Sequence, residues 1–156
     1  MTKRFLTKRT ARTNVFFVLF IFVFIIVTSI SIEWYRIFTL KEYIDTEMSR
    51  ALNIAVDSAM LDEYRMEHIS KIDLAVAKSE FKSYLSTEMK LNSSNERLEK
   101  GKVIFKLIIT KEVLEESPAK YEITGIIRTK PVILGNLVNL DIDIPFKQTS
   151  RNQRYE

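Results

Sequence analysis

The sequence contains no cysteine and only one histidine, His68. The absence of cysteine excludes disulfide bonds, thiolate nucleophiles and cysteine-ligated zinc. A single imidazole also gives little basis for a histidine-rich metal site or a histidine-dependent proton relay. All three glycines and all three prolines lie beyond residue 100, so the glycine-rich loops that bind nucleotide phosphates are missing as well. We therefore predict a non-enzymatic protein without a cofactor.

Acidic residues are missing from the first fourteen positions, which carry five cations: Lys3, Arg4, Lys8, Arg9 and Arg12. The whole chain has 24 lysines and arginines against 20 aspartates and glutamates, so removing these five cations leaves 19 against 20. The excess positive charge therefore belongs to a short N-terminal tail and not to a nucleic-acid-binding surface.

One long apolar run, Val15–Ile32, contains eighteen residues and no charge. As a helix it would extend roughly 27 Å, close to the thickness of a membrane's hydrocarbon core. Trp34 and Tyr35 follow it and are predicted interfacial anchors. Because cations flanking a span stay in the cytoplasm, we expect a single-pass protein of the cell membrane with its N-terminus cytoplasmic and residues from 33 onward extracytoplasmic.

Two alternatives concern this N-terminal region. The basic residues are interpreted as a topogenic signal, and a docking peptide for a cytoplasmic partner is the other interpretation. The apolar run itself could be a cleaved secretory signal, because Ser29 and Ser31 place small residues where a signal peptidase cuts. The run is longer than the roughly 7–15 apolar residues of an ordinary signal, which favours a retained anchor.

Apolar residues then recur at helical spacing and predict a packing stripe: Ile37, Leu40, Ile44, Met48, Leu52, Ala55 and Ala59. We expect this helix to continue from the membrane span to about residue 66. The stripe could instead be the seam of a coiled coil, but its decay into alanines favours close packing within one chain. A second helix is predicted from Leu74 to about Met89, capped by Asp73. Its inner face is expected to consist of Leu74, Ala77, Phe81, Tyr84, Leu85 and Met89.

Strand patterns occupy the last third of the chain. Val103, Phe105, Leu107 and Ile109 alternate with other residues, Tyr121–Lys130 forms a second run, and Leu140, Ile142, Ile144 and Phe146 alternate with Asp141, Asp143 and Pro145. Turns are predicted at Ser117-Pro118 and Gly135-Asn136. Proline has no backbone N–H to donate to a neighbouring strand, so Pro145 indicates an edge strand or the end of a strand.

The predicted fold class is α+β: a long N-terminal transmembrane and amphipathic helix packed on a small antiparallel sheet of three or four strands, with a second, shorter helix. We divide the chain into a basic tail (1–14), a transmembrane helix (15–32), an extracytoplasmic domain (33–146) and a polar C-terminal tail (147–156) that frays. Residues 92–100 are interpreted as a polar connection.

Two groups of ionisable residues are candidates for chemistry. Glu63 and Glu67 lie one helical turn apart with His68 adjacent, but this is not the arrangement that brings two imidazoles to one metal. Asp141 and Asp143 should face water, since they alternate with buried isoleucines. We expect a solvated helix end and a polar sheet face, and no metal or catalytic site.

The order of these elements resembles pilin-like proteins, most of all the TadE-like and TadG-like pseudopilins of bacterial pilus and secretion assemblies. The residues that carry the resemblance are Val15–Ile32, the stripe from Ile37 to Ala59, and the late segments Thr129–Pro131 and Leu140–Phe146. No glycine precedes the apolar helix for a prepilin peptidase to cut, and the span contains no glutamate. These two departures favour an accessory subunit over a polymerising one.

We therefore predict a membrane-anchored accessory or assembly subunit of a bacterial pilus, secretion or DNA-transfer apparatus. Its expected partners are the lipid bilayer and other proteins of an envelope assembly, with no nucleic acid and no small-molecule substrate evident. The alternative is an extracytoplasmic ligand-sensing or interaction module that signals through a separate partner chain. A tethered enzyme fits least well, because no nucleophile–base pair is visible.

Overall fold

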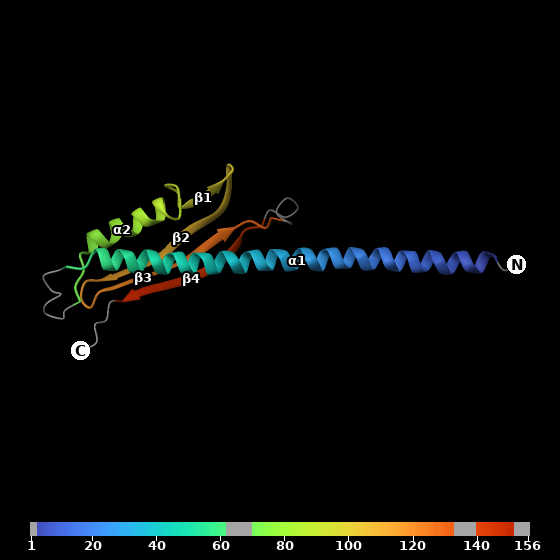
Figure 1. The fold of residues 1–156 in the computed structure, drawn as a ribbon, viewed down its shortest axis with the longest axis horizontal. Helices are drawn as coiled ribbons and strands as arrows, with labels where there is room; N and C mark the ends of the chain where they lie inside the picture. Colours follow the sequence, from blue (N-terminus) through green and yellow to red (C-terminus); the bar gives the residue numbers. More distant parts are fainter. Residues whose placement is uncertain (1–2, 62–69, 133–139, 152–156) are drawn as a thin grey trace. The chain divides into compact units, whose positions relative to one another are not determined.

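The computed structural model describes residues 3–61, 70–132 and 140–151, with side chains described from residue 14 onward. The elements are α1 (Lys3–Ser58), α2 (Leu74–Thr87), β1 (Glu96–Glu99), β2 (Lys102–Glu115), β3 (Lys120–Thr129) and β4 (Ile142–Arg151) (Figure 1). The chain forms two compact units, Met1–Phe38 and Thr39–Glu156. The second unit contains both layers of the α+β fold.

Helix α1 is uninterrupted from Lys3 to Ser58, as expected for a segment without glycine or proline. The prediction that it continues to about residue 66 is wrong. After Ser58 the backbone leaves the helix, because the Leu61 N–H donates to the Lys71 carbonyl (3.2 Å) and Met60 pairs with Ile72 in an antiparallel bridge. The backbone of Met60 and Leu61 thus pairs with the segment before α2 instead of continuing the helix.

Helix α2 begins as predicted at Leu74, with Asp73 as its N-cap. The Asp73 carboxylate accepts hydrogen bonds from the N–H groups of Ala75 (2.8 Å) and Val76 (3.1 Å), which have no partners within the helix. The predicted inner face is buried with one exception: Leu74 is exposed. Helical side chains tilt toward the N-terminus, so a first-turn residue points past the end of its own helix.

The four strands form an antiparallel meander in the order β1-β2-β3-β4. This confirms the predicted α+β class. Ser117 and Pro118 lie in the turn between β2 and β3, as predicted. β4 is an edge strand, and Pro145 lies in its middle opposite Ile126. Because proline has no N–H to give, an edge strand is where the sheet tolerates it.

Two predictions about strand boundaries are wrong. β1 lies within the segment 92–100 that was expected to be only a polar connection, and it pairs with the start of β2. β4 continues to Arg151, which pairs with Lys120, so residues 147–151 belong to the sheet and do not fray. The remaining residues, 152–156, and the predicted turn at Gly135-Asn136 lie outside the described part of the chain.

One face of the sheet supplies its half of the core. The buried sheet residues on this face are Phe105, Leu107, Tyr121, Ile123, Ile127, Ile144 and Phe146. The ring of Phe81 on α2 contacts that of Tyr121, with centroids 5.4 Å apart. Figure 1 shows α2 and the C-terminal part of α1 beside the sheet. The alternation predicted from the sequence fails at Val103 and Leu140, which are exposed. Val103 lies near the start of β2 and Leu140 lies two residues before β4, both beyond the packed core.

Candidate membrane segment and interaction surfaces

The apolar run Val15–Ile32 lies within α1, and its side chains are not used for packing. Its fifteen large apolar residues are between 42% and 69% exposed. By length and composition this helix could cross a membrane, and its most apolar part is not buried at all. A core helix of a water-soluble protein would bury one face, whereas the described part of the chain covers no face of this run.

The polar residues of the run are compatible with lipid because two of their hydroxyl groups are satisfied within the helix. Thr28 Oγ1 donates to the Phe24 carbonyl (2.8 Å), and Ser31 Oγ donates to the Val27 carbonyl (2.9 Å). A hydroxyl group in hydrocarbon is costly without a partner, and bonds to the carbonyl four residues earlier remove that cost. The run can therefore enter a bilayer without orphaning these donors.

The flanks of the run carry the groups expected near a membrane surface. Trp34 and Tyr35, the predicted anchors, are both strongly exposed. Glu33 is the first acid after the run, and Arg36 donates to its Oε1 from Nε (2.9 Å) and Nη2 (2.7 Å). This pair neutralises the charge at the end of the apolar run. The five basic residues of the tail lie in the first turns of α1, and their side chains are outside the described set.

The predicted packing stripe enters the core of the domain. Ile44, Met48, Leu52, Ala55 and Ala59 are buried, whereas Ile37 and Leu40 are half-buried. Alanines at the end of the stripe allow close approach, consistent with the bond that Ala59 O accepts from the N–H of the α2 cap, Asp73 (2.9 Å).

Two hydrogen bonds that involve tyrosine tie the layers together. Tyr84 of α2 donates to Glu47 Oε2 of α1 (2.6 Å), and Arg97 of β1 donates to Tyr43 OH of α1. The Arg97 guanidinium also lies 5.3 Å from the centre of the Tyr43 ring, within cation–π range. Burial, helped by Glu47, raises the pKa of Tyr84 to about 12. These contacts fix α1 against both α2 and the sheet.

The buried Tyr121 makes another hydrogen bond, which lies within the sheet. Its hydroxyl donates to Glu112 Oε1 on β2 (2.7 Å), and the side chain itself is inaccessible to solvent. Burial raises the pKa of Tyr121 well above its ordinary range. A buried phenol with a strong acceptor is a structural arrangement, because deprotonation would place two negative charges side by side.

The second sheet face carries ion pairs. Arg128 binds Asp143 through two bonds of 2.7 and 2.8 Å, and this arginine holds the pKa of the aspartate below its usual range. Glu122 pairs with Lys147 (3.0 Å) and with Lys120 (3.6 Å), and the bond from Lys147 lowers its pKa. The aspartate therefore faces solvent as predicted, with its charge matched across the strands.

No cluster of three or more metal-binding side chains occurs within the described residues. Asp141 is exposed. The other candidates, Glu63, Glu67 and His68, lie outside the described part of the chain.

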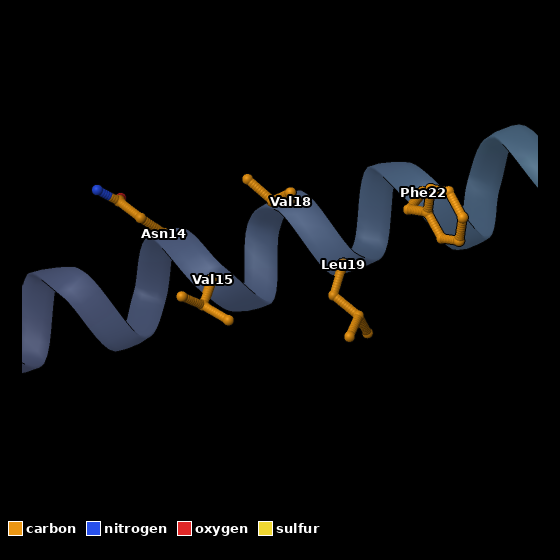
Figure 2. A pocket seen from close by; sticks show the side chains of 5 residues that line it. All are labelled: Asn14, Val15, Val18, Leu19 and Phe22. Atoms are coloured by element: carbon orange, nitrogen blue, oxygen red, sulfur yellow. The ribbon is translucent and has the colours of Figure 1, made fainter.

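Surface hollows fall into two kinds. One is lined by Asn14, Val15, Val18, Leu19 and Phe22, which all come from a single helix (Figure 2). A furrow between side chains of one exposed apolar helix fits lipid chains better than a discrete ligand. In the domain, a hollow lies between α2 and the turn before β1, where Asn92 Oδ1 accepts bonds from the N–H groups of Ser94 and Glu96 (2.9 Å each). The Asn92 amide oxygen thus holds the turn.

Sequence reasoning missed β1 and the contact between Arg97 and Tyr43. The local signal for β1 was Lys100-Gly101, a two-residue turn before a clear strand, although lysine at its first position makes this signal weak. The tyrosine–glutamate bonds link residues that are distant in sequence and left no local pattern.

A comparison with protein family models, with curated proteins and with solved structures finds no match to this chain.

Proposed function

We propose that this chain is a single-pass membrane protein whose α+β domain acts as a non-enzymatic accessory or assembly subunit in a bacterial envelope apparatus. The observation that carries the proposal is the exposed apolar helix Val15–Ile32, joined to a domain that buries its own core. Nothing in the described part of the chain covers this apolar helix, and a bilayer would do so.

The domain offers surfaces suited to protein contact more than to catalysis. β4 is a ten-residue edge strand, and edge strands can pair with a strand of another protein. The resemblance to TadE-like and TadG-like pseudopilins rests on the same order of elements and supports a pilus, secretion or DNA-transfer assembly as the setting. The N-terminus is cytoplasmic and the domain extracytoplasmic in this proposal, as the basic tail suggests.

Photo-crosslinking in living cells tests the assembly role. A photoreactive amino acid would replace Thr149 on the edge strand, and in a second variant Lys78 on the exposed side of α2. We expect a discrete protein adduct from one of these positions, and mass spectrometry should identify it as an envelope component. The same crosslinking would be repeated on purified, solubilised protein, where an adduct can form only between copies of this chain. If these self-adducts are the only ones found in cells, the proposal is contradicted. The same holds if neither position yields a protein adduct.

A further inference from the structure

Exposed apolar side chains of the domain gather at the ends of its strands. Seven large apolar residues among the described part of the unit Thr39–Glu156 are exposed. Four of them form what we call the apolar rim: Leu98 (51%), Val103 (51%), Val132 (65%) and Leu140 (58%). A cluster of exposed apolar residues, unlike scattered single ones, indicates a contact surface.

The strand register places the rim residues at the same end of the sheet. Leu98 and Val103 are cross-strand partners beside the turn between β1 and β2. Thr129, the last residue of β3, pairs with Ile142, the first residue of β4, and donates its hydroxyl hydrogen to the Ile104 carbonyl (2.8 Å). The other two rim residues come three positions after Thr129 and two positions before Ile142. All four therefore lie where β2 begins and β3 ends.

This end of the sheet lies against the start of the domain's part of α1. Arg97, next to Leu98 on β1, contacts Tyr43 through a hydrogen bond and its stacked guanidinium. The opposite end of the sheet lies beyond the end of α1, because Met60 pairs with Ile72, whose N–H donates to the Glu116 carbonyl in the turn after β2 (3.2 Å). The apolar rim is thus at the end of the domain where the chain arrives from the apolar run.

The covalent connection keeps this end within reach of a bilayer. Tyr43 follows Ile32, the last residue of the run, by only eleven positions. At about 1.5 Å per residue, a helix of this length extends roughly 16 Å, whereas one headgroup layer is about 5–8 Å thick. The connection therefore keeps this end of the sheet within about 10 Å of the outer edge of the headgroups.

Lysines accompany the apolar rim. Lys100 and Lys102 are exposed at the turn between β1 and β2, and Glu99 is the only acid in that turn. Lys100 and Gly101 have φ angles of 50° and 75°, the left-handed pair that a tight type I′ turn requires, so the turn is short and well defined. Apolar side chains that enter the headgroup boundary, flanked by ammonium groups that bind phosphate, are the usual composition of a membrane-contacting surface.

We propose that the apolar rim, with Lys100 and Lys102, docks on the outer surface of the membrane that holds the span, and that its ligand is the anionic phospholipid headgroup layer. The inference rests on the proposed membrane anchoring. It assigns the domain a defined membrane-facing end and leaves the edge strand β4 and the second sheet face available for protein partners.

Depth-dependent fluorescence quenching tests the docking. The chain has no cysteine, so Leu98→Cys, Val76→Cys and Phe22→Cys each give one labelling site for an environment-sensitive fluorophore in the full-length protein. Val76 is a matched control, because it is also an exposed apolar residue but lies in the first turn of α2, near the other end of the sheet. The labelled proteins would be reconstituted in phosphatidylglycerol–phosphatidylethanolamine vesicles that contain nitroxide lipids.

We expect the label at Leu98 to shift to the blue and to be quenched by lipid nitroxides near the headgroups, while the label at Val76 is unaffected. Phosphatidylcholine vesicles should give weaker quenching at Leu98, and Lys100→Gln combined with Lys102→Gln should weaken it in anionic vesicles. Quenching at Phe22 without quenching at Leu98 would overturn the docking while leaving the anchor intact. Absence of quenching at Phe22 would instead contradict the anchor.

A blue shift at Leu98 without lipid quenching would mean that another protein copy covers the apolar rim, and would also overturn the proposal. Should Leu98→Cys fail to fold, the label at Val103→Cys reports on the same surface, because the two residues are cross-strand partners.

Discussion

The ring of Phe146 on β4 packs directly against Gly125 on β3. A Cβ built on residue 125 would come closest to the backbone carbonyl oxygen of Ile108 on β2, and it would lie 2.6 Å from Cε1 of the Phe146 ring. Gly125 and Phe146 are cross-strand partners. Phe146 is buried, so its ring cannot swing into solvent without opening the core. The close approach of the Ile108 carbonyl and of the Phe146 ring, and not backbone freedom, therefore requires glycine at this position.

We predict that Gly125→Ala lowers the free energy of unfolding by about 1–3 kcal/mol, the usual cost of overpacking a core. Denaturant unfolding of the full chain in detergent measures this. Adding Phe146→Leu to Gly125→Ala should recover part of the loss, because the two residues are in contact and their effects are not additive. Equal stability of Gly125→Ala and the original chain would contradict the packing described.

We predict that the protein loses stability at high pH, because two of its tyrosines have raised pKa values. Burial raises the pKa of Tyr84 to about 12, and burial also raises the pKa of Tyr121. An unfolded tyrosine ionises near pH 10. Because the folded chain holds these protons more tightly, the contribution of both tyrosines is complete below pH 10. The contribution of Tyr84 is lost as the pH rises through about 12, and that of Tyr121 continues to fall at higher pH.

Unfolding measured between about pH 9 and pH 12 checks this expectation. Tyr84→Phe and Tyr121→Phe should each flatten the decline of stability with pH, because each removes one phenol that titrates late. At neutral pH the substitution at Tyr121 should cost about 0.5–1.5 kcal/mol for its lost hydrogen bond to Glu112. If stability declines with pH equally in both variants and in the original chain, the decline does not come from these two phenols and the prediction is wrong.

Periodicity predicted much of the fold, and its failures have physical reasons. The stripe from Ile44 to Ala59, the cap at Asp73 and the alternation around Ile144 each follow from one element's own geometry. β1 was missed because Glu96–Glu99 contains a single apolar residue and is held by Arg97 on Tyr43, a contact from another element. The end of β4 was missed because its polar residues pair with β3 at the sheet edge, where no apolar alternation is needed.

The candidate surfaces were less predictable than the fold. The apolar run was visible because it needs no tertiary context, whereas the apolar rim combines residues from the ends of four strands. Such a surface exists only once the strand register is known.

A substitution in the turn between β1 and β2 should stabilise the protein. Lys100 has a φ of 50°, a left-handed conformation that asparagine adopts more readily than lysine. We predict that Lys100→Asn raises the free energy of unfolding by up to about 1 kcal/mol, and that Gly101→Ala, at a φ of 75°, lowers it. Thermal unfolding of the two variants measures both changes. A less stable Lys100→Asn variant would contradict the turn geometry.

The acidic residues of the last strand should be dispensable for function. Asp143 only pairs with exposed Arg128, and exposed ion pairs contribute little. Asp141→Asn and Asp143→Asn should therefore support growth or assembly in a strain that lacks the original chain, with nearly unchanged folding. The small contribution of Asp143 should be lost only as the pH falls through its lowered pKa. Complete loss of function in a folded Asp143→Asn protein would indicate carboxylate chemistry and contradict the non-enzymatic role.

The most direct test of the account is the sidedness of single cysteines in intact cells. Thr7→Cys, in the basic tail, and Lys78→Cys, exposed on α2, would be treated with a maleimide that cannot cross membranes. The account predicts that Lys78→Cys is labelled in intact spheroplasts, that Thr7→Cys is labelled only after permeabilisation, and that both residues remain in one full-length membrane-bound chain. Labelling of Thr7→Cys in intact spheroplasts, or mature protein that begins after Ser31, would contradict a retained anchor with a cytoplasmic N-terminus.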